Sequence, residues 1–153
     1  MIKIMFICHG NICRSPLAEF IMKDLVKKEG FENDFYIASS ATSTEEIGNP
    51  VYPPIARILD RLDINYSGKR ATQVKKSDYD KFDYLICMDG NNLRNLSRII
   101  GSDTENKVHL LLDFADGGYV SDPWYSGDFE TCLKDVSRGC EALLKNLKQN
   151  HKI

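Results

Sequence analysis

The sequence predicts a single α/β domain, residues 1–153, in which helices cover both faces of a parallel sheet. Short apolar runs of strand length alternate with segments whose apolar residues recur at every third or fourth position. The length is also sufficient for one hydrophobic core. A chain of about 150 residues buries about 68–70% of its unfolded surface, so neither disulfides nor metals are needed for folding.

The first predicted strand is the apolar run 2–7, and the segment after it predicts a turn that leads into a helix. Gly10 and Asn11 both tolerate positive φ. Ser15 is a favoured N-cap and is followed by a proline, so we expect the helix to begin near Ser15. Gly30 closes this helix, whose apolar stripe is Leu17, Phe20, Ile21, Leu25 and Val26.

The alternation of strand and helix continues through the middle of the chain. Residues 35–38 predict a second strand, and residues 51–62 predict a second helix introduced by prolines. Between them, residues 39–49 are rich in Ser, Thr and Glu, which indicates a long surface loop of the kind that often carries function. A third strand at residues 84–88 precedes a helix whose apolar stripe is Leu93, Leu96, Ile99 and Ile100.

The last predicted strand is residues 108–112, and the tail of the chain carries the clearest helical pattern. Its apolar residues are Phe129, Cys132, Val136, Cys140, Leu143, Leu144 and Leu147. Strands that alternate with helices in this way form parallel sheets with right-handed crossovers. Ligands bind beyond the carboxyl ends of such strands, and Cys8 lies at the carboxyl end of the first one.

The charge balance and the lack of a long apolar segment exclude several function classes. The chain has 20 Lys and Arg against 22 Asp and Glu, for a net charge of -2. No block of like charge stands out, so we expect neither nucleic acid nor a membrane surface as a partner. The N-terminal apolar run is far shorter than a membrane span of roughly 18 residues and lacks signal-peptide features. We therefore expect a cytoplasmic protein.

The five cysteines form no paired pattern. An odd number without a C-x2-C pair fits neither a disulfide framework nor a four-ligand zinc site. Cys87, Cys132 and Cys140 are expected in the core, because free Cys is among the most often buried residue types. Cys8 and Cys13 differ, because both lie in the turn after the first strand.

Cys8, Arg14 and Ser15 form a C-x5-R-S motif between the first strand and the first helix. A tight loop before a helix directs several backbone N–H groups at one point, where the helix dipole adds about half a positive charge and favours a phosphate. The same field and the nearby Arg stabilise a thiolate, so Cys8 is the expected nucleophile. Arg14 offers two parallel donors to phosphate oxygens. Ser15 either caps the helix or donates to the Cys8 sulfur.

The run 8–19, CHGNICRSPLAE, resembles the phosphate-binding loop of the low-molecular-weight protein tyrosine phosphatases, and residues 122–125, DPWY, resemble their general-acid loop. Similar segments recur in the same order over nearly the whole chain, at Ser39, 41–43, 46–50 and 87–89. The resemblance implies a four-stranded parallel sheet, no metal or other cofactor, and hydrolysis of phosphotyrosine in proteins or peptides through a phosphocysteine. It also implies inorganic phosphate as product and inhibitor.

By this resemblance Cys8, Arg14 and Asp122 are the catalytic residues. A tyrosine phenolate needs a proton to leave, because the pKa of its conjugate acid is about 10, and a carboxylic acid at Asp122 supplies one. The proline after it stiffens that loop. Trp124 and Tyr125 are expected to line a slot deep enough for an aromatic ring. The other expected substrate-binding residues are His9, Gly10, Asn11, Ile12, Cys13 and Ser15.

Three positions depart from the family pattern. His9 follows the nucleophile where the family usually has an apolar residue, and it is expected either to face solvent or to contact substrate. Glu45 stands where many members carry an aromatic residue, and its charge is expected to disfavour acidic peptides. Lys69 stands where a His often holds the loop. A bond from Lys69 to Asn11 would take over that role.

Two enzyme activities and one binding role are alternatives to a tyrosine phosphatase. Relatives of the family act on phosphoarginine, so a protein-arginine phosphatase is the first. A thiol-dependent arsenate reductase needs further cysteines close in sequence to Cys87, and residues 88–112 contain none. The binding role is that of a phosphate-binding module without activity. Binding alone does not require an acid, so the presence of Asp122 together with Cys8 and Arg14 argues against it.

Cys13 lies five residues after Cys8 in the same loop. The pair suggests the hypothesis of a reversible disulfide that protects the nucleophile from over-oxidation. The alternative is that Cys13 is an inert small residue packed beneath the loop.

Overall fold

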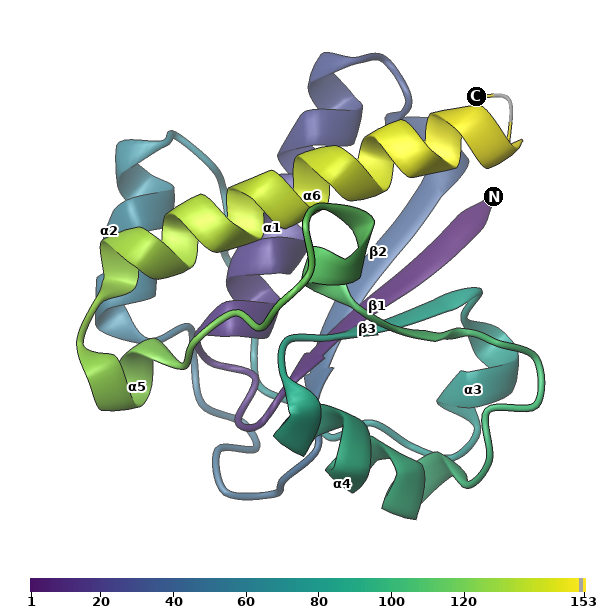
Figure 1. Ribbon diagram of the computed structural model, residues 1–153. Coiled ribbons are helices and arrows are strands. Elements are labelled where there is room, and N and C mark those ends of the chain that lie inside the picture. The colour runs from purple at the N-terminus through teal and green to yellow at the C-terminus, as the bar shows by residue number, and fades with distance from the viewer. Residues whose placement is uncertain (152) are drawn as a thin grey trace.

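The computed structural model describes residues 1–151 and 153 and, within them, contains a four-stranded sheet whose strands are all parallel (Figure 1). The strands are β1 (Ile2–Cys8), β2 (Phe35–Ala41), β3 (Tyr84–Cys87) and β4 (Val108–Leu110), in the order β2-β1-β3-β4. The predicted α/β fold is confirmed. β1 is an interior strand, so the segment that follows it emerges between two neighbours.

Helices cover both faces of the sheet, as the sequence predicted. They are α1 (Arg14–Lys28), α2 (Pro53–Arg61), α3 (Asp78–Lys81), α4 (Gly90–Ile100), α5 (Pro123–Ser126) and α6 (Phe129–His151). Successive β1 side chains point to opposite faces. Ile4 and Phe6 join the larger core with α1, α2 and α6, whereas Met5 and Ile7 join the smaller core with α3 and α4. Among the described residues, no helix combines the length and apolar character needed to cross a membrane.

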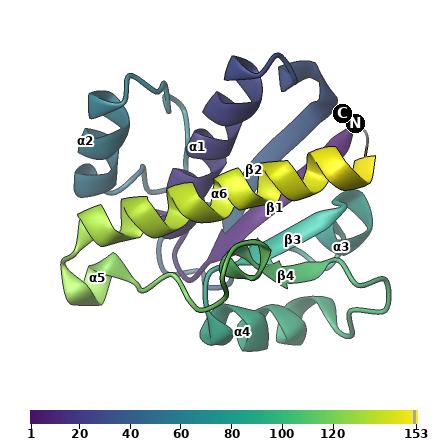
Figure 2. The same ribbon diagram turned by 45° about the horizontal axis from the view of Figure 1, so that its top comes forward.

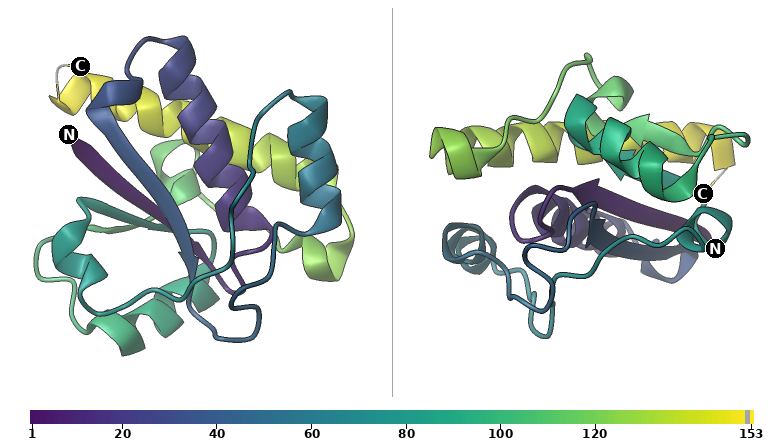
Figure 3. Two further views of the ribbon diagram at one scale, coloured as in Figure 1. Left: turned by 180° about the vertical axis from the view of Figure 1, so that it is seen from behind. Right: turned by 90° about the horizontal axis from the view of Figure 1, so that it is seen from below.

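The larger core is built mainly by α1 and α6. α6 lies across the sheet beside α1 (Figure 2), and the view from behind shows β1 and β2 running along α1 (Figure 3). Phe6, Leu17 and Met22 are fully buried there. Each such side chain stabilises the fold by about 1.5–3 kcal/mol relative to exposure.

α1 begins near Ser15 and ends before Gly30, as predicted, but its N-cap is a different residue. The first helical residue is Arg14, and the N-cap is Cys13, which makes no side-chain capping bond. Ser15 therefore lies inside the first turn and is not the N-cap. At the other end Gly30 has a φ of 80°, and its N–H and that of the next residue bond to carbonyls of the last turn.

β2 is longer than predicted, and β4 is shorter. Ser39 and Ser40 are buried β2 residues in register with β1, not part of a surface loop. Burial of a hydroxyl requires a partner, and Ser39 Oγ donates to Glu19 Oε1 at 2.6 Å. β4 ends at Leu110, where the 3-10 turn η2 (Leu111–Phe114) begins.

The carboxyl edge of the sheet gathers the segments that follow the strands (Figure 1). The loop after β1, the segment after β2, the start of α4 and the short helix α5 lie there together. This is the edge at which parallel α/β sheets bind ligands.

Candidate active site

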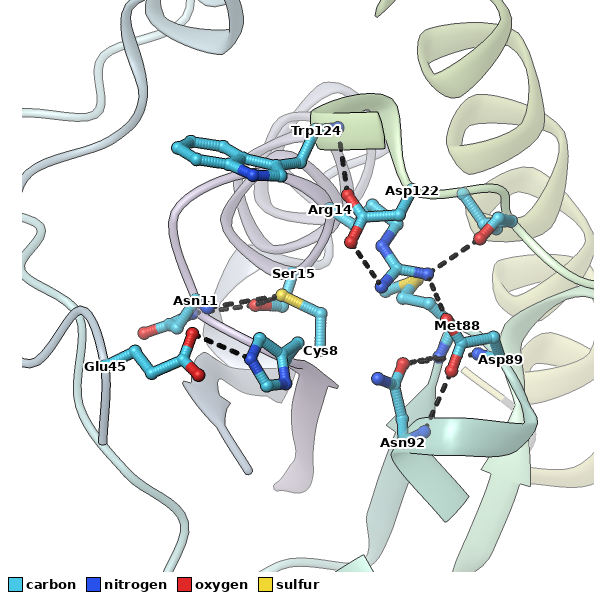
Figure 4. A network of polar contacts seen from close by, with 12 residues as sticks. Cys8, Asn11, Arg14, Ser15, Glu45, Met88, Asp89, Asn92, Asp122 and Trp124 are labelled. Atoms are coloured by element: carbon cyan, nitrogen blue, oxygen red, sulfur yellow. Dashed lines mark hydrogen bonds and ion pairs between the residues drawn. The ribbon is translucent and has the colours of Figure 1, made fainter. Parts of the chain in front are cut away.

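The loop from Cys8 to Arg14 is shaped by Asn11, whose φ of 60° lies in the left-handed region as predicted. Its side chain Nδ2 donates to Ser15 Oγ at 2.8 Å (Figure 4). The same Nδ2 donates to Ser39 Oγ at 2.9 Å, and Oδ1 accepts from the Thr72 N–H at 3.2 Å. An Asn in this conformation is tolerable when local hydrogen bonds hold it. Asn11 thereby fixes the loop to β2 and to α1.

Gly10 serves the loop by its size, not by positive φ. Of the two residues that tolerate positive φ, Asn11 adopts it and Gly10 does not. A Cβ at this position would lie 3.3 Å from Glu46 Cγ. The absence of a side chain therefore lets the segment after β2 approach the loop closely.

The Cys8 sulfur lies at the inner end of the loop and has two hydrogen-bond partners. The Asn11 N–H donates to Sγ at 3.3 Å, and Ser15 Oγ lies 3.0 Å from Sγ (Figure 4). Either atom can donate in the contact between Ser15 Oγ and Sγ, but a thiolate has no hydrogen, so toward the ionised sulfur the hydroxyl is the donor. Of the two roles expected for Ser15, the geometry therefore favours the contact with Cys8.

Arg14 is buried, with 2% of its surface exposed, and its guanidinium is held from three sides. Nη1 donates to Asp89 Oδ2 at 2.7 Å and to the Val120 carbonyl at 2.8 Å, and Nη2 donates to Asp122 Oδ2 at 3.4 Å (Figure 4). Burial opposes the positive charge, but Cys8 and the two carboxylates raise the pKa of Arg14. Arg14 is thus a fixed cation near the Cys8 sulfur.

Asp89 is a site residue to which sequence reasoning gave no role. It caps α4 by accepting from the Asn92 N–H at 2.8 Å, and its other oxygen holds Arg14. A signal was present, because an Asp directly after a buried parallel strand lies at the same edge as Cys8. The Val120 carbonyl carried no such signal, since every residue has one.

Asp122 is the N-cap of α5, and the Pro123 that follows opens this helix. Its Oδ1 accepts from the Trp124 N–H at 3.0 Å, while its Oδ2 faces Arg14. The segment that resembles the general-acid loop therefore caps and begins a short helix. Its cap holds the carboxyl group on the pocket wall.

A pocket of about 100 Å³ opens above the Cys8 sulfur. Apart from Asn11 and Ser15, which support the loop from behind, all predicted site residues line it. Trp124 is 52% exposed and packs on Tyr52 with ring centroids 5.0 Å apart, while Tyr125 is 84% exposed. The lining residues are Cys8, His9, Gly10, Ile12, Cys13, Arg14, Glu45, Glu46, Asp122, Trp124 and Tyr125.

His9 and Glu45 meet at the pocket mouth. His9 Nε2 lies 3.0 Å from Glu45 Oε2, and both side chains are substantially exposed. Two of the departures from the family pattern therefore contact each other. The pair connects the loop after β1 to the segment after β2.

Lys69 does not bond Asn11, so it does not hold the loop in the way that the family's His often does. Its Nζ donates to the Ser39 carbonyl at 2.9 Å and lies 3.7 Å from Glu19 Oε1. Burial lowers the pKa of Lys69, and the nearby Glu19 carboxylate opposes this shift. Lys69 thus supports the end of β2, while Ser15, Ser39 and Thr72 hold Asn11.

All five cysteines are free and buried, which confirms the expected core placement of Cys87, Cys132 and Cys140. Burial, and then the nearby Cys8 sulfur, raises the pKa of Cys13 far above that of an ordinary thiol. Cys13 therefore stays protonated in the folded protein. It lines the same pocket as Cys8.

Comparison with known proteins gives full-length matches. The model of the low molecular weight phosphotyrosine protein phosphatase family matches residues 3–153. The low molecular weight protein-tyrosine-phosphatase YfkJ of Bacillus subtilis is 38% identical over 156 residues, covering 100% of both chains. Its crystal structure superposes with a TM-score of 0.94 and covers 98% of this chain and 96% of that one.

Two further relatives come from animals. The low molecular weight phosphotyrosine protein phosphatase of Gallus gallus is 40% identical over 154 residues, or 94% of each chain. The crystal structure of DARP, a Drosophila arginine phosphatase, has a TM-score of 0.87 at 27% identity and covers 96% of this chain and 98% of that one. The chain therefore belongs to the low molecular weight phosphotyrosine protein phosphatase family. By this homology, it is a protein-tyrosine phosphatase, a hydrolase.

Proposed function

We propose that this enzyme hydrolyses phosphotyrosine through a phosphocysteine on Cys8, with Arg14 binding the phosphoryl group and Asp122 exchanging the proton. One observation carries the proposal. Cys8 and Arg14 come from one loop and Asp122 lies 108 residues after Arg14, yet the three side chains surround one pocket, with the sulfur at its base and the Asp122 carboxyl on its wall. The phosphotyrosine side chain of a protein or peptide would enter from the Trp124 side.

In the first step the Cys8 thiolate attacks phosphorus. A sulfur–phosphorus bond forms, the bond from phosphorus to the phenol oxygen breaks, and Asp122 donates its proton to that oxygen. The loop N–H groups and the Arg14 guanidinium bind the equatorial phosphoryl oxygens. Arg14 needs little reorganisation, because Asp89 and the Val120 carbonyl already fix it.

In the second step water attacks the phosphocysteine. The Asp122 carboxylate accepts a proton from this water, the sulfur–phosphorus bond breaks, and inorganic phosphate is formed. The hydrogen bonds from Ser15 and Asn11 stabilise the departing thiolate. Phosphate occupies the same cradle as the substrate, so it acts as an inhibitor. Because Cys8 must remain reduced, we expect the enzyme to act in the cytoplasm.

Hydrolysis of p-nitrophenyl phosphate by the purified enzyme, with and without a chelator, tests this proposal. Cys8→Ser is expected to reduce turnover to background. Asp122→Asn is expected to lower kcat about a hundredfold or more for phosphotyrosine, since general acid–base catalysis contributes about 10²–10⁴. Asp116→Asn, at an exposed carboxylate paired with Arg138, is the matched control. Activity in Cys8→Ser, or its loss with the chelator, would refute the mechanism.

Phosphoarginine is the second candidate substrate, favoured by the structural similarity to DARP. The pocket lining favours phosphotyrosine over phosphoarginine as the substrate, because the side chains of Ile12 and Trp124 offer apolar surface to an aromatic ring. Matched peptides bearing phosphotyrosine, phosphoserine or phosphoarginine separate these cases. We expect the highest kcat/KM for phosphotyrosine, and a higher value for phosphoarginine would assign the enzyme to the other class.

A further inference from the structure

A second groove, of about 330 Å³, lies next to the candidate active site. The two share His9, which lines both. The segment after β2 forms one side of the groove, with Thr42, and α4 forms the other, with Asn95 and Arg98. A chain segment that leaves the active-site pocket over His9 would enter this groove.

Thr42 carries a polar group that lacks a partner. The residue is 7% exposed, and its Oγ1 is the one buried side-chain oxygen or nitrogen in the described part of the chain without a hydrogen bond. Its backbone is fixed beside the active site, since the Thr42 N–H donates to the Cys8 carbonyl at 3.0 Å. Buried hydroxyls are normally bonded, so this one is an unused hydrogen-bonding group beside the groove that Thr42 lines.

Arg98 gives the groove a positive charge. Its side chain is exposed, and it forms no ion pair with any of the residues that the structure describes. Its contact is a bond from Nη1 to Asn95 Oδ1 at 3.4 Å. Glu45 and Glu46 line the active-site pocket and are not among the residues that line the groove. The groove therefore carries the positive charge of Arg98, whereas the two carboxylates belong to the mouth of the active-site pocket.

We propose that this groove is a substrate subsite that binds an acidic peptide segment next to the phosphotyrosine. A carboxylate of that segment pairs with Arg98, and Thr42 Oγ1 hydrogen-bonds its backbone. The proposal rests on the proposed phosphatase function and adds sequence specificity to it. It also revises the expectation for Glu45, because acidic residues are disfavoured on the Glu45 side alone.

The test compares kcat/KM for phosphotyrosine peptides that carry Glu, Ala or Lys on the N-terminal or on the C-terminal side of the phosphotyrosine. Each value is divided by that for p-nitrophenyl phosphate, which is too small to reach the groove. Glu on one of the two sides is expected to raise the ratio about two- to fivefold over Ala, the effect of an exposed ion pair. Arg98→Glu should remove or invert this preference, and Arg98→Gln should remove it.

Two controls separate the groove from general effects. Arg57→Glu makes the same charge change on the exposed side of α2 and should retain the preference. Thr42→Val should lower the peptide ratio about threefold while leaving the urea midpoint of unfolding unchanged or higher, because the hydroxyl has no partner in the free protein.

The outcomes distinguish the two proposals. The subsite is overturned if the enzyme hydrolyses phosphotyrosine peptides without a preference for Glu. It is also overturned if that preference survives both Arg98 variants. Either result leaves the phosphatase function intact. Failure of the wild-type enzyme to hydrolyse either p-nitrophenyl phosphate or phosphotyrosine peptides overturns the function, and the subsite with it.

Discussion

Asp89 has two tasks that depend on its two oxygens. Oδ1 accepts from the N–H of Asn92 at the start of α4, and Oδ2 accepts from Nη1 of Arg14. A single carboxylate thus connects the third strand–helix turn to the phosphate-binding Arg of the first. In the proposed reaction Asp89 is a positioning residue, because it acts on the phosphoryl group only through Arg14.

Asp89→Asn is expected to lower kcat/KM for p-nitrophenyl phosphate about tenfold. The amide retains the shape and the helix cap but loses one charge-assisted bond to Arg14, worth about 1.5–3 kcal/mol. The loss should appear mainly in KM if Arg14 binds ground state and transition state alike, and in kcat otherwise. Asp80→Asn, at an exposed position of α3, is the control. Unchanged kinetics with Asp89→Asn would contradict the positioning role.

The Cys8–Cys13 disulfide remains a prediction. Both thiols line one pocket, and burial keeps Cys13 protonated, so oxidation is expected to begin at Cys8. Mild peroxide should then give a Cys8–Cys13 disulfide, detected by mass spectrometry as a loss of two hydrogens and reversed by dithiothreitol with return of activity. Cys13→Ala should instead accumulate sulfinic acid on Cys8. Sulfinic acid as the main product in the wild-type enzyme would count against the disulfide.

The order and type of the main elements could be predicted because hydrophobic spacing is a local property. α6 and the end of α1 at Gly30 agree with the structure for this reason. The boundaries that failed depend on distant partners. Ser39 looks like a loop residue in sequence, and it becomes a strand residue because Glu19 and Asn11 satisfy its hydroxyl.

The same distinction applies to the candidate site. Cys8, Arg14 and Asp122 belong to local motifs, and the structure brings them together. The contacts of Arg14 with Asp89 and with the Val120 carbonyl join residues 75 and 106 positions apart. Such partners follow from topology and could not be read from spacing.

At the scale of elements, α6 packs closely on η2 through Gly139. A Cβ added there would lie 2.5 Å from Leu111 Cγ, a distance that requires movement of a fully buried side chain. Gly139→Ala is therefore expected to lower the free energy of unfolding by about 1–3 kcal/mol. The loss is expected even though Ala is more favourable than Gly in a helix interior by about 1 kcal/mol.

Urea unfolding of Gly139→Ala, Leu111→Ala and the double variant checks this prediction. Leu111→Ala alone should cost about 2–5 kcal/mol by leaving a cavity. Because the added methyl group would occupy part of that cavity, the double variant should lose less than the sum of the single variants. Additive losses would show that the two residues do not restrict each other.

At the scale of the whole molecule, burial of the thiols makes stability depend on pH. Burial raises the pKa of Cys132 to about 12 from an ordinary value of 9.0, and the charge of Arg14 opposes this shift. Above about pH 9 the unfolded chain loses this proton while the folded protein keeps it. The folded state then binds more protons, so the contribution of Cys132 is complete below pH 9 and is lost as pH rises toward 12.

Urea unfolding at pH 8 to 10.5 under reducing conditions measures this effect. One such thiol contributes a slope approaching about 1.4 kcal/mol per pH unit above pH 9. Cys132→Ala should lower stability at pH 8, because it leaves a small cavity, but should show a shallower alkaline decline than the wild-type protein. Equal slopes for the two proteins would contradict the buried-thiol explanation.

The wide separation of the site residues in sequence bears on when activity can arise during synthesis. Cys8 and Arg14 are translated first, but the Asp122 carboxylate that faces Arg14 lies 108 residues beyond it. A growing chain on the ribosome therefore carries the Cys8 nucleophile long before it carries the proposed general acid, Asp122. A truncated product that ends before β3 lacks both carboxylates around Arg14. Catalytic turnover would thus indicate that the chain has been synthesised through α5 and that the active site has folded.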